Sequence, residues 1–279
     1  MPEGHTIRRL ARTHHRRFVG REIAVSSPQG RFERGAELVD GRVLRATDAH
    51  GKHLFHVYAD DLVVHVHLGL YGKFTQHTGP VTEPRGQVRM RMVAAARGDE
   101  DPPWADLRGA IACEVLTEGE VETLRARLGP DPLRPDTDPE AAWARISRSR
   151  APLATLLMDQ SVIAGVGNVY RAEVLFRHGL DPLLPGRDLG RERWEAVWTD
   201  LVALLGDGVR RGAIDTVAQD HLHGGCDHAA GEGHRRSCGR AVYVYRRTGE
   251  PCLVCGTEVA RRTHAARNLF WCPHCQGGE

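Results

Sequence analysis

Two groups of residues in this 279-residue sequence are candidates for a reactive site and for a metal site. The first is at the start, where Pro2 precedes the carboxylate of Glu3. If Met1 is removed, Pro2 carries a secondary amine, which can attack a carbonyl-like carbon. The alternative is structural, because proline is also favoured at the first position of a helix.

The second group is a set of four cysteines near the end of the chain. Cys252 and Cys255 form one Cys-x2-Cys pair, and Cys272 and Cys275 form another. Two such pairs let four thiolates converge on Zn²⁺ in a tetrahedral arrangement. Disulfides are the alternative, but an intracellular chain disfavours them. Because four thiolates leave no open coordination position, we expect one structural zinc ion.

The remaining cysteines and a histidine-rich stretch do not form a second motif of this kind. Cys226 and Cys238 lie among several histidines, but their spacing matches no known metal site. We interpret residues 213–240 as a long polar loop whose cysteines bind no metal. Cys113 stands in an apolar segment and is expected in the core.

Composition and charge restrict the classes of protein and partner. An apolar fraction of 41% supports folded cores, and no apolar run approaches the ~18 residues of a membrane span. No signal peptide is predicted, so we expect a soluble intracellular protein. The net charge is only +2, but arginines gather over residues 8–21 and 235–267, which favours a polyanion as partner. Only Lys52 and Lys73 are lysines in this arginine-rich chain.

Periodicity and turn residues indicate the elements that must position these groups. Residues 3–18 have the spacing of an amphipathic helix, and residues 21–117 alternate as short strands, which predicts a β-sandwich or barrel. A proline-rich stretch separates them from helical sequence. The predicted domains are residues 1–127 (β-rich), 128–139 (linker), 140–240 (helical, with the loop) and 241–279 (zinc finger).

One glycine-rich turn in the helical part could bind an anion. Gly165 and Gly167 lie between two apolar helical segments, and Asn168 follows them at a helix N-terminus. Backbone N–H groups at such a terminus can bind a phosphate. The alternative is a turn that serves only to pack two helices.

Four separated motifs together resemble the formamidopyrimidine-DNA glycosylase and endonuclease VIII family. They are MPEG at residues 1–4, GKHL at 51–54, DQSVIAGVGNVYRAEVLF at 159–176 and RNLFWCPHCQ at 267–276. The resemblance covers nearly the whole chain, in order. It implies an α+β fold with an N-terminal β-sandwich flanked by helices, a helix-two-turns-helix domain and a β-hairpin zinc finger.

The resemblance also implies roles for individual residues. Pro2 matches the amine that attacks C1′ of a nucleotide flipped from the duplex, and Glu3 matches the general acid that helps to open the sugar. Lys52 matches a strand lysine that contacts DNA phosphate and assists catalysis. One departure concerns His5 and Thr6, which replace a Pro-Glu pair common in the family, so the role of that second carboxylate is in doubt here.

Four further residues match DNA-binding positions of the family. Asn168 and Arg267 match residues that bind the phosphates flanking the flipped nucleotide. Leu70 and Tyr71 match residues inserted into the gap that the flipped base leaves, although Gly69 stands where a larger polar residue is often found. The alternative for Leu70 and Tyr71 is that they are core residues at a strand end.

We therefore expect a bifunctional DNA glycosylase and abasic-site lyase of base-excision repair. The MPEG and GLYG motifs favour the endonuclease VIII branch and oxidised pyrimidines as substrates. The expected cofactor is one structural Zn²⁺, and the expected partner is damaged double-stranded DNA, bound by a monomer in the bacterial cytoplasm at the nucleoid. The alternatives are an enzyme that removes 8-oxoguanine and formamidopyrimidines, and a zinc-finger protein that binds damaged DNA without catalysis.

Overall fold

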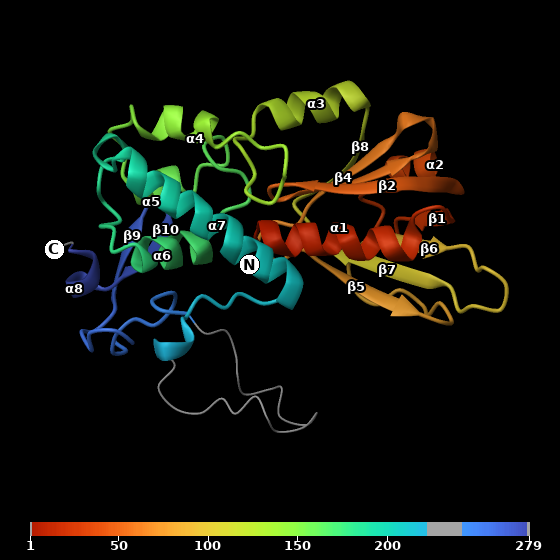
Figure 1. The fold of residues 1–279 in the computed structure, drawn as a ribbon. Helices are drawn as coiled ribbons and strands as arrows, with labels where there is room; N and C mark the ends of the chain where they lie inside the picture. Colours follow the sequence, from red (N-terminus) through yellow and green to blue (C-terminus); the bar gives the residue numbers. More distant parts are fainter. Residues whose placement is uncertain (1, 222–241, 278–279) are drawn as a thin grey trace. The chain divides into compact units, whose positions relative to one another are not determined.

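The computed structural model describes residues 2–221 and 242–277, which form two compact units divided between Leu128 and Gly129 (Figure 1). The first unit is mainly β-structure, and the second is mainly helical and ends in a two-stranded hairpin. In the described ranges, no helix is long and apolar enough to cross a membrane.

The first unit is an antiparallel β-sandwich of eight strands. One layer has the order β5-β7-β6-β1 and the other has the order β2-β3-β4-β8, and a short pairing of β1 with β2 joins them. The strands are β1 (Glu22–Ser26), β2 (Arg42–His50), β3 (His53–Tyr58), β4 (Val63–His67), β5 (Lys73–Thr78), β6 (Val88–Ala94), β7 (Pro103–Arg108) and β8 (Ala112–Leu116).

The core of the sandwich also includes one face of helix α1 (Gly4–Phe18). Ile7 and Phe18 of this helix are completely buried with Leu54 of β3 and Met90 of β6. Burying a side chain of this size contributes about 1.5–3 kcal/mol, so the helix is held firmly along its length. The residues that precede α1 are thereby fixed at one end of the sandwich.

A second helix, α3 (Glu118–Ala126), covers part of the outer face of the β2-β3-β4-β8 layer. Its N-terminus is a capping box in which Thr117 and Glu120 exchange hydrogen bonds between side chain and backbone. Val121 of the helix packs on Phe55 and Val63 of the sheet. The other helix of this unit is α2 (Glu33–Val39).

The second unit begins inside the stretch that the sequence suggested as a linker. The amide of Gly129 donates to the Gln160 carbonyl at 2.9 Å, and the amide of Ala164 donates to the Pro130 carbonyl at 3.0 Å. The first residues of the stretch are therefore part of this unit. Its elements are α4 (Pro139–Ile146), α5 (Leu153–Leu156), α6 (Asn168–Arg177), α7 (Arg191–Arg211), β9 (Ala260–His264), β10 (Arg267–Trp271) and α8 (Pro273–Gln276).

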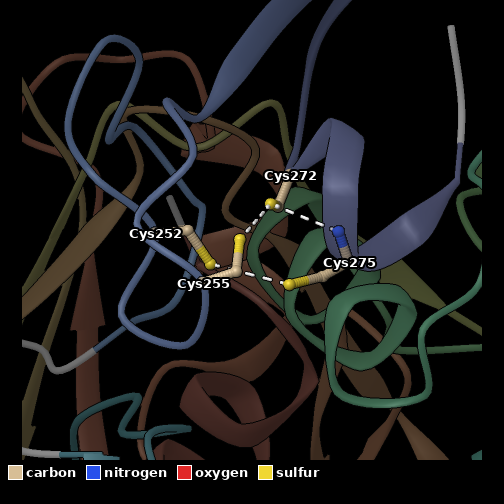
Figure 2. A group of neighbouring side chains, drawn as sticks. All are labelled: Cys252, Cys255, Cys272 and Cys275. Atoms are coloured by element: carbon tan, nitrogen blue, oxygen red, sulfur yellow. Dashed lines mark hydrogen bonds between the residues drawn. The ribbon is translucent and has the colours of Figure 1, made fainter.

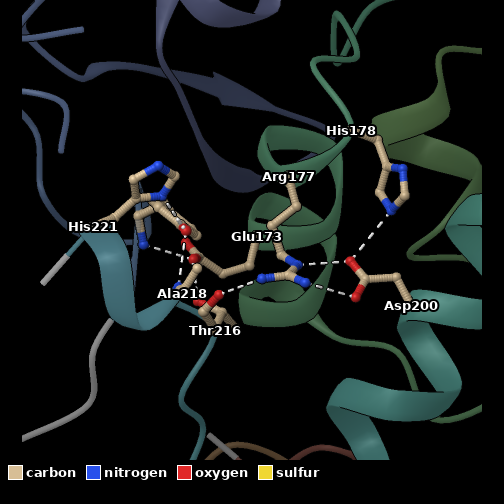
Figure 3. A network of polar contacts seen from close by, with 8 residues as sticks. Glu173, Arg177, His178, Asp200, Thr216, Ala218 and His221 are labelled. Atoms are coloured by element: carbon tan, nitrogen blue, oxygen red, sulfur yellow. Dashed lines mark hydrogen bonds and ion pairs between the residues drawn. The ribbon is translucent and has the colours of Figure 1, made fainter. Parts of the chain in front are cut away.

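A buried carboxylate ties the chain that leads to the hairpin onto α6 (Figure 3). Glu173 of α6 is completely buried. It accepts hydrogen bonds from the backbone amides of Tyr243, Val244 and Tyr245 at 2.7–3.0 Å and from the hydroxyl of Thr216 at 2.5 Å. Four donors satisfy a buried charge that would otherwise be costly, so this contact fixes the start of the C-terminal segment.

Candidate functional site: a zinc centre and a set of DNA-binding residues

The four predicted cysteines converge in the second unit (Figure 2). Their Sγ atoms all lie within 4.8 Å of one another. The Sγ atoms of Cys252 and Cys275 are 3.9 Å apart, and those of Cys255 and Cys272 are 3.4 Å apart. A tetrahedral site with Zn–S bonds of about 2.3 Å has S–S edges of about 3.8 Å, so the arrangement fits Zn²⁺. Zinc is structural here, because all four positions would be filled by thiolates.

Local structure brings each cysteine pair into place. The amide of Gly256 donates to the Cys252 carbonyl at 3.0 Å, which forms a tight turn around the first pair. Cys272 caps the short helix α8, where its Sγ accepts from the Cys275 amide at 3.4 Å. The side chain of Gln276 donates to the Leu180 carbonyl at 2.9 Å, which links this helix to the end of α6. Cys226 and Cys238 lie outside the described residues.

The hairpin beside the zinc site presents Arg267. This arginine is exposed and begins β10, directly after a turn in which Ala265 and Ala266 have φ values of 47° and 57°. Asn168, the first residue of α6, donates from Nδ2 to the Asn268 carbonyl at 3.1 Å. Asn168 is thus held next to the hairpin residue that follows Arg267, and the two predicted phosphate-binding residues lie on directly connected elements.

Arg171 makes this connection rigid, and no motif in the sequence marks it. It is only 1% exposed. Its guanidinium donates to the Asn268 carbonyl at 3.0 Å and to the Ala154 carbonyl at 3.1 Å, and it also donates to Oδ1 of Asn168. In the sequence, the position of Arg171 three residues after Asn168 indicates that the two side chains can meet, because residues three apart on a helix lie on one face.

Pro2 and Glu3 lie just before α1. The helix begins at Gly4, so Pro2 does not occupy its first position. Glu3 occupies the N-cap position and is completely buried, but its side chain makes no capping hydrogen bond. Its backbone carbonyl instead accepts from the Thr6 amide at 2.9 Å. The buried carboxylate therefore lies directly after Pro2, at the end of α1.

Lys52 lies in the turn between β2 and β3 rather than within a strand. Gly51 supports this turn with a φ of 56°, and His50 and His53 pair directly across it. The lysine is half-buried.

Leu70 and Tyr71 are exposed, so the alternative that they are core residues is wrong. Their side chains are 44% and 85% exposed, and the turn that carries them closes through a hydrogen bond from the Gly72 amide to the Leu68 carbonyl. Ile111, which the sequence analysis did not identify, is 69% exposed beside them. Gly69 has a φ of 66°, which strains any larger residue, and a Cβ there would lie 2.1 Å from a side-chain atom of Ile111, which would have to move.

Known proteins resemble this chain along its whole length. Residues 1–111 match the N-terminal domain of formamidopyrimidine-DNA glycosylase, residues 128–220 match its H2TH domain, and residues 249–277 match the zinc finger found in FPG and IleRS. The chain is 54% identical to a Mycobacterium tuberculosis protein named Endonuclease 8 1, with 99% of this chain and 100% of that protein covered. It is 31% identical to a formamidopyrimidine-DNA glycosylase of Thermomicrobium roseum, with 83% and 81% covered.

Solved structures have the same fold. The Lactococcus lactis Fpg bound to DNA with an abasic site matches with a TM-score of 0.77 at 22% identity, over 98% of this chain and 99% of that chain. The MutM (FPG) protein of Thermus thermophilus matches with a TM-score of 0.74 at 27% identity, over the full length of both chains. These matches and the four-cysteine centre show that the chain belongs to the formamidopyrimidine-DNA glycosylase and endonuclease VIII family of DNA-repair glycosylases and abasic-site lyases.

Proposed function

We propose that this enzyme excises oxidised pyrimidines from double-stranded DNA through the amine of Pro2 and then cleaves the strand at the resulting abasic site. The observation that carries the proposal is the placement of Pro2 and Glu3, with the proline outside α1 and the buried carboxylate not used to cap it. An α-amine with an ordinary pKa of about 7.7–8.0 has a usable neutral fraction at neutral pH.

The reaction follows from these two groups. The Pro2 nitrogen forms a bond to C1′ while the bond from C1′ to the damaged base breaks, and the base leaves with the proton that the attacking amine loses. Glu3 then gives a proton to the ring oxygen as the bond from C1′ to that oxygen breaks and the sugar opens. The product is an iminium ion, which acidifies the proton on C2′. Loss of that proton breaks the C3′–O bond and releases the 3′ part of the strand, which keeps the phosphate at its 5′ end. A second elimination breaks the C5′–O bond, and water then hydrolyses the iminium to regenerate the amine.

Other residues bind the DNA in this proposal. Lys52, Asn168 and Arg267 contact phosphates, as amide and cationic donors commonly do. Leu70 and Tyr71 fill the gap left by the flipped nucleotide. Their exposure supports this role, because an apolar wedge and an aromatic ring can replace the stacking that flipping removes.

We propose that the enzyme works as a monomer in the cytoplasm, at the nucleoid. The pyrimidine preference is supported by the MPEG and GLYG motifs and by the relative named Endonuclease 8 1. Relatives named formamidopyrimidine-DNA glycosylase support the second candidate, excision of 8-oxoguanine and formamidopyrimidines. Duplex oligonucleotides that each contain one lesion, scored for base release and for strand cleavage, distinguish the two.

Borohydride trapping tests the nucleophile, because an iminium is reducible. On abasic-site DNA, the reduced adduct should map to Pro2 by peptide mass spectrometry, in protein whose first residue is Pro2. Pro2→Gly should lose most strand cleavage and still bind DNA. Glu3→Gln should abolish base excision and leave cleavage of preformed abasic sites partly intact. An adduct on Lys52 or Lys73 would refute the assignment, and binding without any cleavage by wild type would favour the non-catalytic alternative.

A further inference from the structure

One face of the hairpin formed by β9 and β10 packs on the helices of the same unit. The strand register pairs His264 of β9 with Arg267 of β10, so the two side chains lie on the same face of the hairpin. Leu269, two residues further along β10, shares this face and is 1% exposed in the core of the unit. Arg267 is exposed at the end of the strand. His264 therefore lies on the inner face of the hairpin, directly across from the predicted phosphate-binding arginine.

A hydrogen bond joins this histidine to the short helix α5. Nε2 of His264 lies 2.8 Å from the hydroxyl oxygen of Thr155, and both residues are half-buried. A hydroxyl can donate or accept, so the bond forms with either tautomer of the ring. The two residues are 109 positions apart, so the bond ties β9 to a distant part of the chain.

Helix α5 is a fixed point for this contact. Leu153 and Ala154, which precede Thr155, are 1% and 0% exposed. The amide of Leu153 donates to the Leu184 carbonyl at 2.9 Å. The amide of Ala154 donates to the Pro182 carbonyl, also at 2.9 Å. Because α5 is buried and hydrogen-bonded to a second segment, the Thr155 hydroxyl is held in one place.

The other strand of the hairpin is attached separately. The carbonyl of Asn268 in β10 accepts hydrogen bonds from Asn168 at 3.1 Å and from Arg171 at 3.0 Å. An attachment on one strand alone leaves the hairpin able to tilt about that point, and an attachment on the other strand prevents the tilt. The bond from His264 supplies this second attachment. Arg267 lies next to the first attachment in sequence and across from the second.

We propose that His264 is a positioning residue for Arg267, acting through its hydrogen bond to Thr155. The inference rests on the proposed function, in which Arg267 contacts a DNA phosphate. A guanidinium binds phosphate with N–H groups in a fixed planar arrangement, so a tilt of the strand that carries it weakens the contact. His264 acts by holding that strand, so its effect on DNA binding exists only while Arg267 is present.

The test measures binding to duplex DNA that contains a tetrahydrofuran analogue of an abasic site, by fluorescence anisotropy. The analogue has no leaving group at C1′, so binding is measured without the reaction at Pro2. Thr155→Val keeps the shape of the side chain and removes its hydroxyl, so it should weaken binding about fivefold, as expected for one lost hydrogen bond. Thr155→Ser keeps the hydroxyl and should bind like wild type. The control is Thr199→Val, the same change at an exposed position of α7, which should also bind like wild type.

Changes at His264 repeat the comparison from the other side of the bond. His264→Gln places an amide within reach of the Thr155 hydroxyl and should bind like wild type, whereas His264→Leu should weaken binding as much as Thr155→Val does. The two weakening changes combined should have the effect of one, because both remove the same hydrogen bond. Zinc content should stay full in every variant, since neither residue is among the four clustered cysteines.

A cycle with Arg267 separates positioning from a general structural effect. Arg267→Ala combined with Thr155→Val should bind no more weakly than Arg267→Ala alone, because changes that act through one group are not additive. Thermal unfolding shows whether each variant folds. Thr155→Val changes the side-chain volume very little, so it keeps the test decisive if His264→Leu folds poorly.

Three results would overturn the inference: equal losses in the valine and serine variants of Thr155, a Thr155→Val enzyme that binds as tightly as the Thr199→Val control, or multiplicative losses in the double variant with Arg267→Ala. Wild-type binding by Arg267→Ala would also overturn it, because His264 would then have nothing to position. Borohydride trapping at Pro2 is scored separately, so failure of this inference is distinguishable from failure of the proposed reaction.

Discussion

A buried histidine pair should make the N-terminal unit sensitive to mild acid. His14 of α1 and His56 of β3 are both completely buried, with Nδ1 of His14 2.8 Å from Nε2 of His56. Phe18 and Phe74 pack edge-on against His14, with ring centroids 5.4 and 4.7 Å away. Burial lowers the pKa of His56 to about 3, and burial and the neighbouring His56 lower the pKa of His14 well below 6.5.

The sign and size of the effect follow from linkage. Both pKa values are lower in the folded state, so the unfolded chain takes up more protons when the pH falls below about 6.5. The stability is fully present above that pH and is lost progressively as the pH falls toward 3. For His56, pKa values of about 6.5 unfolded and 3 folded give a loss of about 2 kcal/mol at pH 5. The pKa shift of His14 has the same sign, so its loss of stability adds to that of His56 over the same pH range.

Urea unfolding of wild type and of His14→Leu/His56→Leu at pH 7.5, 6 and 5 measures this loss. Changing both residues avoids leaving one polar ring without its partner in an apolar core. Between pH 7.5 and 5 the double variant should lose less stability than wild type, by the about 2 kcal/mol of His56 plus the contribution of His14, which has the same sign. His77→Leu, which removes an exposed histidine, should follow wild type. Parallel curves for wild type and the double variant would refute the assignment of acid sensitivity to this pair.

Three further predictions concern the DNA-binding turns and the zinc centre. Gly72→Ala should impair excision and leave the zinc content unchanged, because its Cβ would lie 2.2 Å from the backbone oxygen of Leu68 and distort the turn that carries Leu70 and Tyr71. Excision and zinc content are measured on the same preparation. Ala265→Asn with Ala266→Gly should raise the thermal midpoint of the hairpin, since these residues tolerate positive φ at lower cost. Cys272→Ser should lose zinc and DNA affinity, whereas Arg267→Ala should keep zinc and reduce the salt slope of DNA binding by about one; an unchanged slope would remove this arginine from the interface.

The elements that the sequence predicted well are those set by local patterns. Helix α1 follows from the spacing of Ile7, Ala11 and Phe18, and the zinc centre follows from two short cysteine pairs. The start of α6 at Asn168 follows from the glycines of the preceding turn. Each pattern involves residues close in the chain, whose relative placement the backbone geometry largely determines.

The features that the sequence did not predict depend on contacts between distant residues. Arg171 reaches Asn268, 97 positions away, and only the folded unit shows that one guanidinium joins α5, α6 and the hairpin. Glu114 meets His65 because β8 pairs with β4, a choice of register that no local pattern specifies. Ile111 has the sequence pattern of an ordinary apolar residue, and only the folded unit shows that it is exposed beside Gly69.

The two histidine clusters of the N-terminal unit differ in what fixes their protons. In the described residues, neither outer ring nitrogen of the His14–His56 pair has a hydrogen-bond partner, so nothing fixes the direction of the bond between the rings. In the other cluster, around His65, Glu114 can only accept, so the Nδ1 atom of His65 carries a proton and that ring has a fixed orientation. Whether an acid contacts one ring therefore decides whether a nitrogen of that ring is always a donor.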